Sequence, residues 1–177
     1  HLANVRKIIQ PLGLELAADL PFKSDINDAG IDAVVKQIAS SGAQMVFNHG
    51  STGIYEKIIR KAREQQLTTQ FYGVNSGSTQ LARHLGPLAQ NMIFAQVMPS
   101  PWVRKTAITR AYQEAFKAYK PKEDFSYGSL EGYMTARALV EALRRAGPNP
   151  TRDSFVAGLK DADLQIDGLK VNYPMAL

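Results

Sequence analysis

Two short segments of the chain carry most of the side chains that could bind a small molecule. Their members are small, or form hydrogen bonds without carrying a fixed charge. They are Asn48, His49, Gly50, Ser51 and Thr52 in the first segment and Asn75 and Ser76 in the second. Such groups bind carboxylates, amides and hydroxyls, and the unpaired N–H groups at a helix N-terminus favour acidic groups further. We predict that these residues bind a ligand, although capping and turning a helix require the same residue types.

Catalytic and metal-binding patterns are missing from the sequence. There is no cysteine, and the three histidines, His1, His49 and His84, have no partner histidine at ligand spacing. Neither a glycine-rich nucleotide-binding motif nor a serine elbow is present. We therefore predict a protein that is not an enzyme, with no catalytic residue, metal or cofactor. An α/β enzyme with His49 as its base remains an alternative.

The elements that position the two segments follow from the periodicity of apolar residues. Residues 1–99 alternate between helical spacing and short apolar runs. The predicted helices cover residues 5–12, 31–38, 55–62 and 78–84, and the predicted strands cover 14–20, 44–47, 70–74 and 92–97. This alternation predicts an α/β fold with a doubly wound parallel sheet. Both candidate segments follow a strand, so we expect them at the carboxyl edge of the sheet, where such folds bind ligands.

The pattern changes at Pro99-Ser100-Pro101, after which helices dominate. We predict helices over about 108–119, 127–146 and 151–159, with Gly147 ending the second and Thr151 capping the third. Residues 171–177 read as a strand that runs into Pro174. The sequence thus predicts an α/β lobe over 1–99 and a largely helical segment over 100–177.

Composition narrows the possible partners. Hydrophobic residues make up 45% of the 177, and the formal net charge is +5. The basic residues are scattered among acids, which is typical of a solvated surface and argues against nucleic-acid binding. No apolar run is long enough to cross a membrane.

One segment resembles a known family closely. Residues 129–147 are similar to the helix EGYxxARxLVEALRRAG of the leucine/isoleucine/valine-binding-protein family, and residues 62–73 are similar to its segment QAREAGL…PFxG. The resemblance implies a type I periplasmic binding protein, whose two lobes close on a solute like a Venus flytrap. It implies that 1–99 belongs to the second lobe, that both lobes are incomplete here, and that Pro99, Ser100, Pro101 and Trp102 form part of a hinge.

The same resemblance implies a function. Members of the family are solute receptors of ABC importers, so the expected partners are a small-molecule solute and a membrane permease, and the expected location is periplasmic or otherwise extracytoplasmic. The family often places an acid for the ligand's ammonium group where this sequence has Asn75. An amide or an organic or aromatic acid is thus as plausible a solute as an amino acid. A ligand-sensing domain of a transcriptional regulator or chemoreceptor is the alternative on the same fold.

Overall fold

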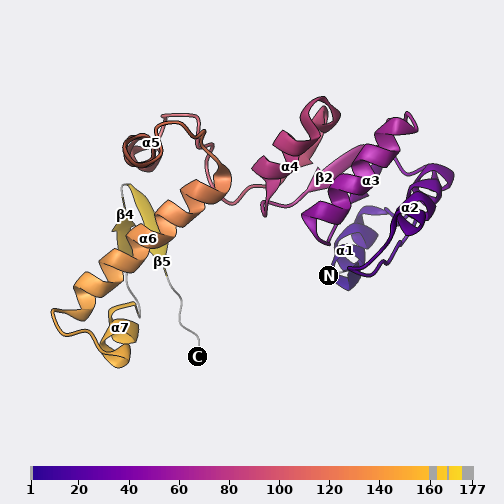
Figure 1. The fold of residues 1–177 in the computed structure, drawn as a ribbon. Helices are drawn as coiled ribbons and strands as arrows, with labels where there is room; N and C mark the ends of the chain where they lie inside the picture. Colours follow the sequence, from indigo (N-terminus) through magenta and orange to yellow (C-terminus); the bar gives the residue numbers. More distant parts are fainter. Residues whose placement is uncertain (1, 160–162, 167, 173–177) are drawn as a thin grey trace. The chain divides into compact units, whose positions relative to one another are not determined.

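The chain forms two compact units. The computed structural model describes residues 2–159, 163–166 and 168–172 (Figure 1). The first unit ends at Gln96 and the second begins at Val97, close to the change in pattern at Pro99. Each unit has its own packed core.

The first unit is a parallel three-stranded sheet with helices between the strands. In chain order the elements are α1 (Leu2–Ile9), the 3₁₀ helix η1 (Gln10–Leu12), α2 (Asp28–Ser41), β1 (Met45–Phe47), α3 (Thr52–Glu64), β2 (Gln70–Gly73), α4 (Ser78–Leu85), the 3₁₀ helix η2 (Gly86–Ala89) and β3 (Ile93–Phe94). The strands lie in the order β1-β2-β3, with Val46 opposite Phe71 and Gly73 opposite Phe94. The predicted α/β class with a parallel sheet is confirmed.

The core of this unit lies between the sheet and its helices. Helix α3 contacts both α2 and α4, and Figure 1 shows it between them. Ile59, Val35 and Phe71 are fully buried there, and the rings of Tyr55 and Phe71 meet edge to face at 5.9 Å. The apolar positions spaced three and four apart in the sequence are therefore the ones that bury the helices, as the periodicity predicts.

The predicted strand over residues 14–20 is wrong. This segment has no strand structure, and Leu14 and Leu16 are exposed. A strand exists only where a neighbour completes its hydrogen-bond ladder, and none of the three strands of the sheet pairs with this segment. The segment instead leads from η1, closed by Gly13 in the left-handed conformation (φ 70°), toward α2.

The second face of the sheet is apolar and open to solvent. Met45, Phe47 and Ile93 alternate with the buried positions along their strands and are about half exposed. Parallel sheets are normally covered on both faces.

The second unit is built around three helices and a hairpin. It contains α5 (Ala107–Tyr119), α6 (Tyr127–Ala146), α7 (Arg152–Leu159), β4 (Asp163–Ile166) and β5 (Leu169–Asn172), with β4 and β5 antiparallel. Helices α5 and α6 both start with capping boxes, Thr106 with Thr109 and Ser126 with Ser129. The Tyr112 hydroxyl, from the middle of α5, lies 2.6 Å from the Ser129 hydroxyl and ties α5 to the start of α6.

The predicted helix ends of this unit agree with the structure. Gly147 ends α6 with φ 90°, and the Thr151 hydroxyl accepts a hydrogen bond from the Ser154 N–H at 3.1 Å. Strand β5 overlaps the predicted strand at residues 171 and 172, and the rest of that prediction lies outside the described residues. Strand β4 was not predicted.

Helix α6 also leaves part of its surface uncovered. Leu139, Val140 and Leu143 form an exposed apolar strip, whereas Ala138 and Ala142 on the other side are buried. In the part of the chain that the structure describes, no helix is both long and apolar enough to span a bilayer.

Candidate functional site

The first candidate segment connects β1 to the start of α3. The Ser51 hydroxyl caps α3 by accepting a hydrogen bond from the Ile54 N–H at 3.3 Å. The Asn48 side-chain amide donates to the Gly50 carbonyl at 3.3 Å and so shapes the turn. The N–H groups of Thr52 and Gly53, at the beginning of the helix, have no acceptor among the described residues. They offer two donors and the positive end of a helix to a ligand.

A residue that the sequence did not single out packs against this segment. A Cβ placed on Gly50 would lie only 3.1 Å from the Phe22 ring, so the ring and the backbone of the loop are in contact. Phe22 precedes α2 and is half-buried against the core of the first unit. The small size of Gly50 is therefore needed for this contact, which gives the loop an apolar neighbour.

The second candidate segment connects β2 to the start of α4. Asn75 is half-buried, Ser76 is exposed, and the Asn75 carbonyl accepts a hydrogen bond from the Ser78 N–H at 3.3 Å. Gly77 precedes the helix in the left-handed conformation with φ 64°. No side-chain hydrogen bond of Asn75 is formed with the described residues, so its amide is available to a ligand.

The two segments meet at one point. A Cβ on Gly77 would lie 3.1 Å from the Thr52 methyl carbon, so the start of α3 touches the turn before α4. Both lie at the carboxyl edge of the sheet, because β1 and β2 are parallel neighbours. The structure thus brings together the two loops that the sequence placed on the same edge, including Thr52 from the first and the turn holding Asn75 and Ser76 from the second.

Gln96 adds a polar group at the same edge. It follows β3, and its side-chain amide donates to the buried Ser78 hydroxyl at 2.8 Å. Its carbonyl oxygen Oε1 is buried and has no hydrogen-bond partner among the described residues. A buried acceptor without a donor is uncommon, and such groups often mark functional sites. The signal in the sequence was a polar residue at the carboxyl end of the third strand.

A buried tyrosine supports the floor of this edge. The Tyr55 hydroxyl donates to the Tyr72 carbonyl at 2.7 Å and lies 3.3 Å from the Val46 carbonyl, so it links β1 and β2 just before their carboxyl ends. Burial raises the pKa of Tyr55 far above its ordinary value, an effect only partly offset by the hydrogen bond to Tyr72 and by Arg63. The hydroxyl therefore remains protonated and acts as a donor.

The charges at this edge suit an acidic or neutral group better than a basic one. Neither loop, residues 48–53 or 75–80, contains an aspartate or glutamate. The starts of α3 and α4 present N–H groups and positive dipole ends. An ammonium group would find no carboxylate in these two loops.

His49 and His84 do not come together as a catalytic or metal-binding pair. His49 is exposed in the first loop, whereas His84 Nδ1 lies 3.2 Å from Glu56 Oε2 near the end of α4. Within the described ranges, no three histidine or acidic side chains are grouped as metal ligands would be.

The predicted hinge residues are anchored within the second unit. Pro101 is buried, and its carbonyl accepts a hydrogen bond from the Gln113 side chain at 2.8 Å. The Trp102 indole N–H donates to Asp124 at 3.2 Å, and its ring meets Tyr127 edge to face at 5.6 Å. The segment that begins with Pro99 and Ser100 is thus fixed firmly at one end, and its role as a hinge stays a prediction.

Comparison with known proteins gives one family model and two solved structures of binding proteins that are similar to this chain. Residues 2–175 match the family model described as periplasmic binding protein. The chain is similar to the crystal structure of an extracellular ligand-binding receptor from Verminephrobacter eiseniae (25% identity, TM-score 0.70) and covers 82% of its own length and 42% of that protein. It is also similar to a possible leucine/isoleucine/valine-binding protein from Rhodopirellula baltica (25% identity, TM-score 0.75). That match covers 89% of this chain and 43% of the Rhodopirellula protein.

The match therefore concerns less than half of each of these two receptors. No curated protein sequence matches the chain. The family match nevertheless extends over nearly all of its residues, and the parallel sheet with intervening helices is the architecture of a type I lobe. The chain belongs to the periplasmic binding protein family.

Proposed function

We propose that this chain is part of an extracytoplasmic solute receptor that delivers a small molecule to the permease of an ABC importer. The observation that carries the proposal is the contact between Thr52 and Gly77, which joins two polar, helix-starting loops at the carboxyl edge of the sheet. Family membership over residues 2–175 supports a binding role rather than a catalytic one.

The solute is held, in this proposal, by the loop 48–52 and by Asn75 and Ser76. The N–H groups at the start of α3 donate hydrogen bonds to a carboxylate or carbonyl oxygen of the solute, and the Asn75 amide forms a further hydrogen bond. Phe22 supplies apolar contact beside Gly50. The absence of acids from both loops favours an amide, a neutral solute or an organic acid.

The test uses the intact protein to which this chain belongs. Thermal-shift screening against amino acids, amides, and aliphatic and aromatic acids identifies a solute, and calorimetry then measures its affinity for three variants. Asn75→Ala removes one hydrogen bond and is expected to weaken binding about tenfold. Gln37→Ala removes an exposed amide on α2 and serves as the matched control.

Asn75→Asp tests the charge argument. The new carboxylate lies beside the proposed solute position, so affinity for an acidic solute is expected to fall further than in Asn75→Ala because like charges repel. An affinity that neither Asn75→Ala nor Asn75→Asp changes would refute the placement of the site, and so would an equal loss in Gln37→Ala. Turnover of the solute by the purified protein would refute the receptor function itself.

A further inference from the structure

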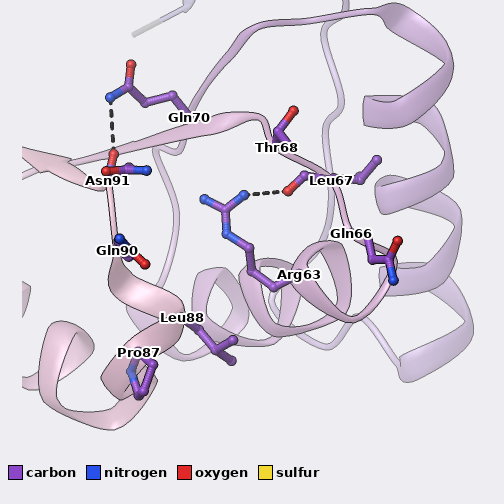
Figure 2. Close-up of a pocket in the computed structure, with 9 residues that line it drawn as sticks. All are labelled: Arg63, Gln66, Leu67, Thr68, Gln70, Pro87, Leu88, Gln90 and Asn91. Atoms are coloured by element: carbon purple, nitrogen blue, oxygen red, sulfur yellow. Dashed lines mark hydrogen bonds between the residues drawn. The ribbon is translucent and has the colours of Figure 1, made fainter.

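A pocket lies at the opposite edge of the sheet from the two candidate loops. It has a volume of about 480 Å³ and opens beside the end of α3, the start of β2 and the turn before β3 (Figure 2). The residues that line it include the charged Arg63 and the amide-bearing Gln66, Gln90 and Asn91. Because β2 and β3 begin here, the pocket lies at the amino edge of the sheet, away from the two loops proposed to bind the transported solute.

Arg63 is the charged group of this pocket. One terminal nitrogen, Nη1, donates to the carbonyls of Leu67 and Thr69, and the guanidinium stacks on Phe71 at 5.0 Å. The other edge, formed by Nε and Nη2, makes no hydrogen bond with the described residues. In Figure 2 that edge faces the side of the pocket where Gln90 and Asn91 lie.

The open edge of Arg63 has the geometry that binds acidic groups. Nε–H and Nη2–H form a parallel pair of donors that matches the two oxygens of a carboxylate or phosphate. The half-buried side chain forms no ion pair with the described residues, and no acidic residue lines the pocket. The charge of Arg63 is thus not neutralised locally, unlike that of Arg60, which pairs with Glu56 at 2.8 Å.

The backbone of the pocket is held in an unusual conformation. Gln66 (φ 59°) and Asn91 (φ 65°) are the non-glycine residues with positive φ in the described part of the chain, and both line this pocket. Gln66 ends α3 through hydrogen bonds from its N–H to the Arg63 carbonyl and from the Leu67 N–H to the Ala62 carbonyl. Glycine is the usual residue at this position, so the glutamine there is under backbone strain at the border of the pocket.

We propose that this pocket binds a small organic anion through a carboxylate or phosphate group held by the Nε/Nη2 edge of Arg63. A volume of about 480 Å³ lies in the ordinary range for small-molecule pockets. This anion site is separate from the proposed solute-binding loops, and the proposal for it holds whether or not the protein delivers a solute to a permease.

The experiment follows the Arg63 Nε–H signal by NMR while acetate or inorganic phosphate is added to the protein, with chloride as the ionic-strength control. A saturable shift with either anion, absent with chloride, is expected, and which anion saturates identifies the preferred acidic group. Gln66→Gly, followed through the same signal, is expected to bind the anion as the unmodified protein does, because the Gln66 side chain lies on the Leu67 side of Arg63 and not beside its Nε/Nη2 edge (Figure 2).

Two further variants make the test specific. Arg63→Lys keeps the charge but loses the paired donors, so the affinity is expected to fall about tenfold, followed through the backbone signal of Asn91. Arg60→Lys, one turn earlier on α3, is expected to bind as the unmodified protein does. A lack of saturation with both anions would overturn the proposal, and so would equal affinity in Arg63→Lys and the unmodified protein.

Discussion

Replacing Tyr55 with phenylalanine removes a single oxygen atom from beneath the candidate solute-binding edge. Tyr55 is 2% exposed, and its hydroxyl donates to the Tyr72 carbonyl at 2.7 Å. The ring remains in Tyr55→Phe, so the edge-to-face contact with Phe71 is expected to persist. The substitution therefore isolates the hydrogen bond between α3 and the sheet.

The expected cost follows from burial. One hydrogen bond makes a net contribution of about 0.5–1.5 kcal/mol to the free energy of unfolding, and a buried carbonyl left without its donor adds to the loss. We expect Tyr55→Phe to destabilise the first unit by about 1–2 kcal/mol. The matched control is Tyr72→Phe. Tyr72 is half-buried, and its hydroxyl makes a longer hydrogen bond of 3.3 Å to the Gln70 side chain. Its expected cost is about 0.5 kcal/mol or less.

Hydrogen exchange is the suitable assay, because the single tryptophan, Trp102, lies in the other unit and does not report on this sheet. Amides of β1 and β2 are expected to exchange about tenfold faster in Tyr55→Phe and nearly unchanged in Tyr72→Phe. Equal exchange in the two variants would refute the role assigned to the Tyr55 hydroxyl.

The raised pKa of Tyr55 adds a pH dependence to this prediction. An unfolded tyrosine loses its proton near its ordinary pKa of 10.0, whereas the folded one keeps it. The contribution to stability is fully present below that pH and declines as the pH rises above it. Tyr55→Phe is expected to lose this alkaline decline, measured as the urea midpoint against pH.

The remaining predictions concern three further residues. Gly77→Ala forces alanine into φ 64° and against the Thr52 methyl, so we expect a loss of about 1–2 kcal/mol in urea unfolding, whereas Gly53→Ala, with open space around it, serves as the control. Gln66→Gly removes the strain of a side chain at positive φ and is expected to stabilise the first unit by about 0.5–1 kcal/mol. An unchanged or lower urea midpoint would show that Gln66 is not strained. The hydrogen bond from Arg60, more than that from His84, lowers the pKa of the Glu56 carboxyl below its ordinary 4.5. The ionised carboxylate therefore stabilises the fold fully above about pH 4.5, and this stabilisation is lost as the pH falls through the lowered pKa. Glu56→Gln should flatten acid unfolding there, and a profile identical to that of the unmodified protein would argue against it.

Most of the helices could be predicted from the sequence because their buried faces follow the helical period. Ile31, Val35 and Ile38 are spaced as an amphipathic helix requires, and all three are buried. The segment 14–20 shows the limit of this reasoning. Its residues alternate loosely, but the strand also depends on a neighbour, which the periodicity of a single segment does not reveal.

The β4–β5 hairpin had a signal that was overlooked. Ile166 pairs with Leu169, so two residues connect the strands, and the sequence there is Asp167-Gly168. Asp-Gly between two short apolar runs is a strong indication of a hairpin.

The candidate site was predictable in its loops but not in its supports. The segments 48–52 and 75–76 follow strands, and parallel strands bring such loops to one edge. Phe22 and Gln96 reach the same edge from distant parts of the chain. Their proximity depends on how the helices and strands pack, and neither residue belongs to a local pattern that would reveal it.

The most direct test of the receptor assignment is to identify what the intact protein carries. The protein is purified without added ligand, its bound small molecule is released by denaturation and identified by mass spectrometry, and the affinity is then measured by calorimetry with Thr52→Ala and Asn75→Ala beside the unmodified protein. We predict one solute bound per protein, not chemically altered, with affinity weakened about tenfold by Asn75→Ala. Absence of any bound or bindable small solute, or conversion of that solute into a product, would contradict the receptor assignment.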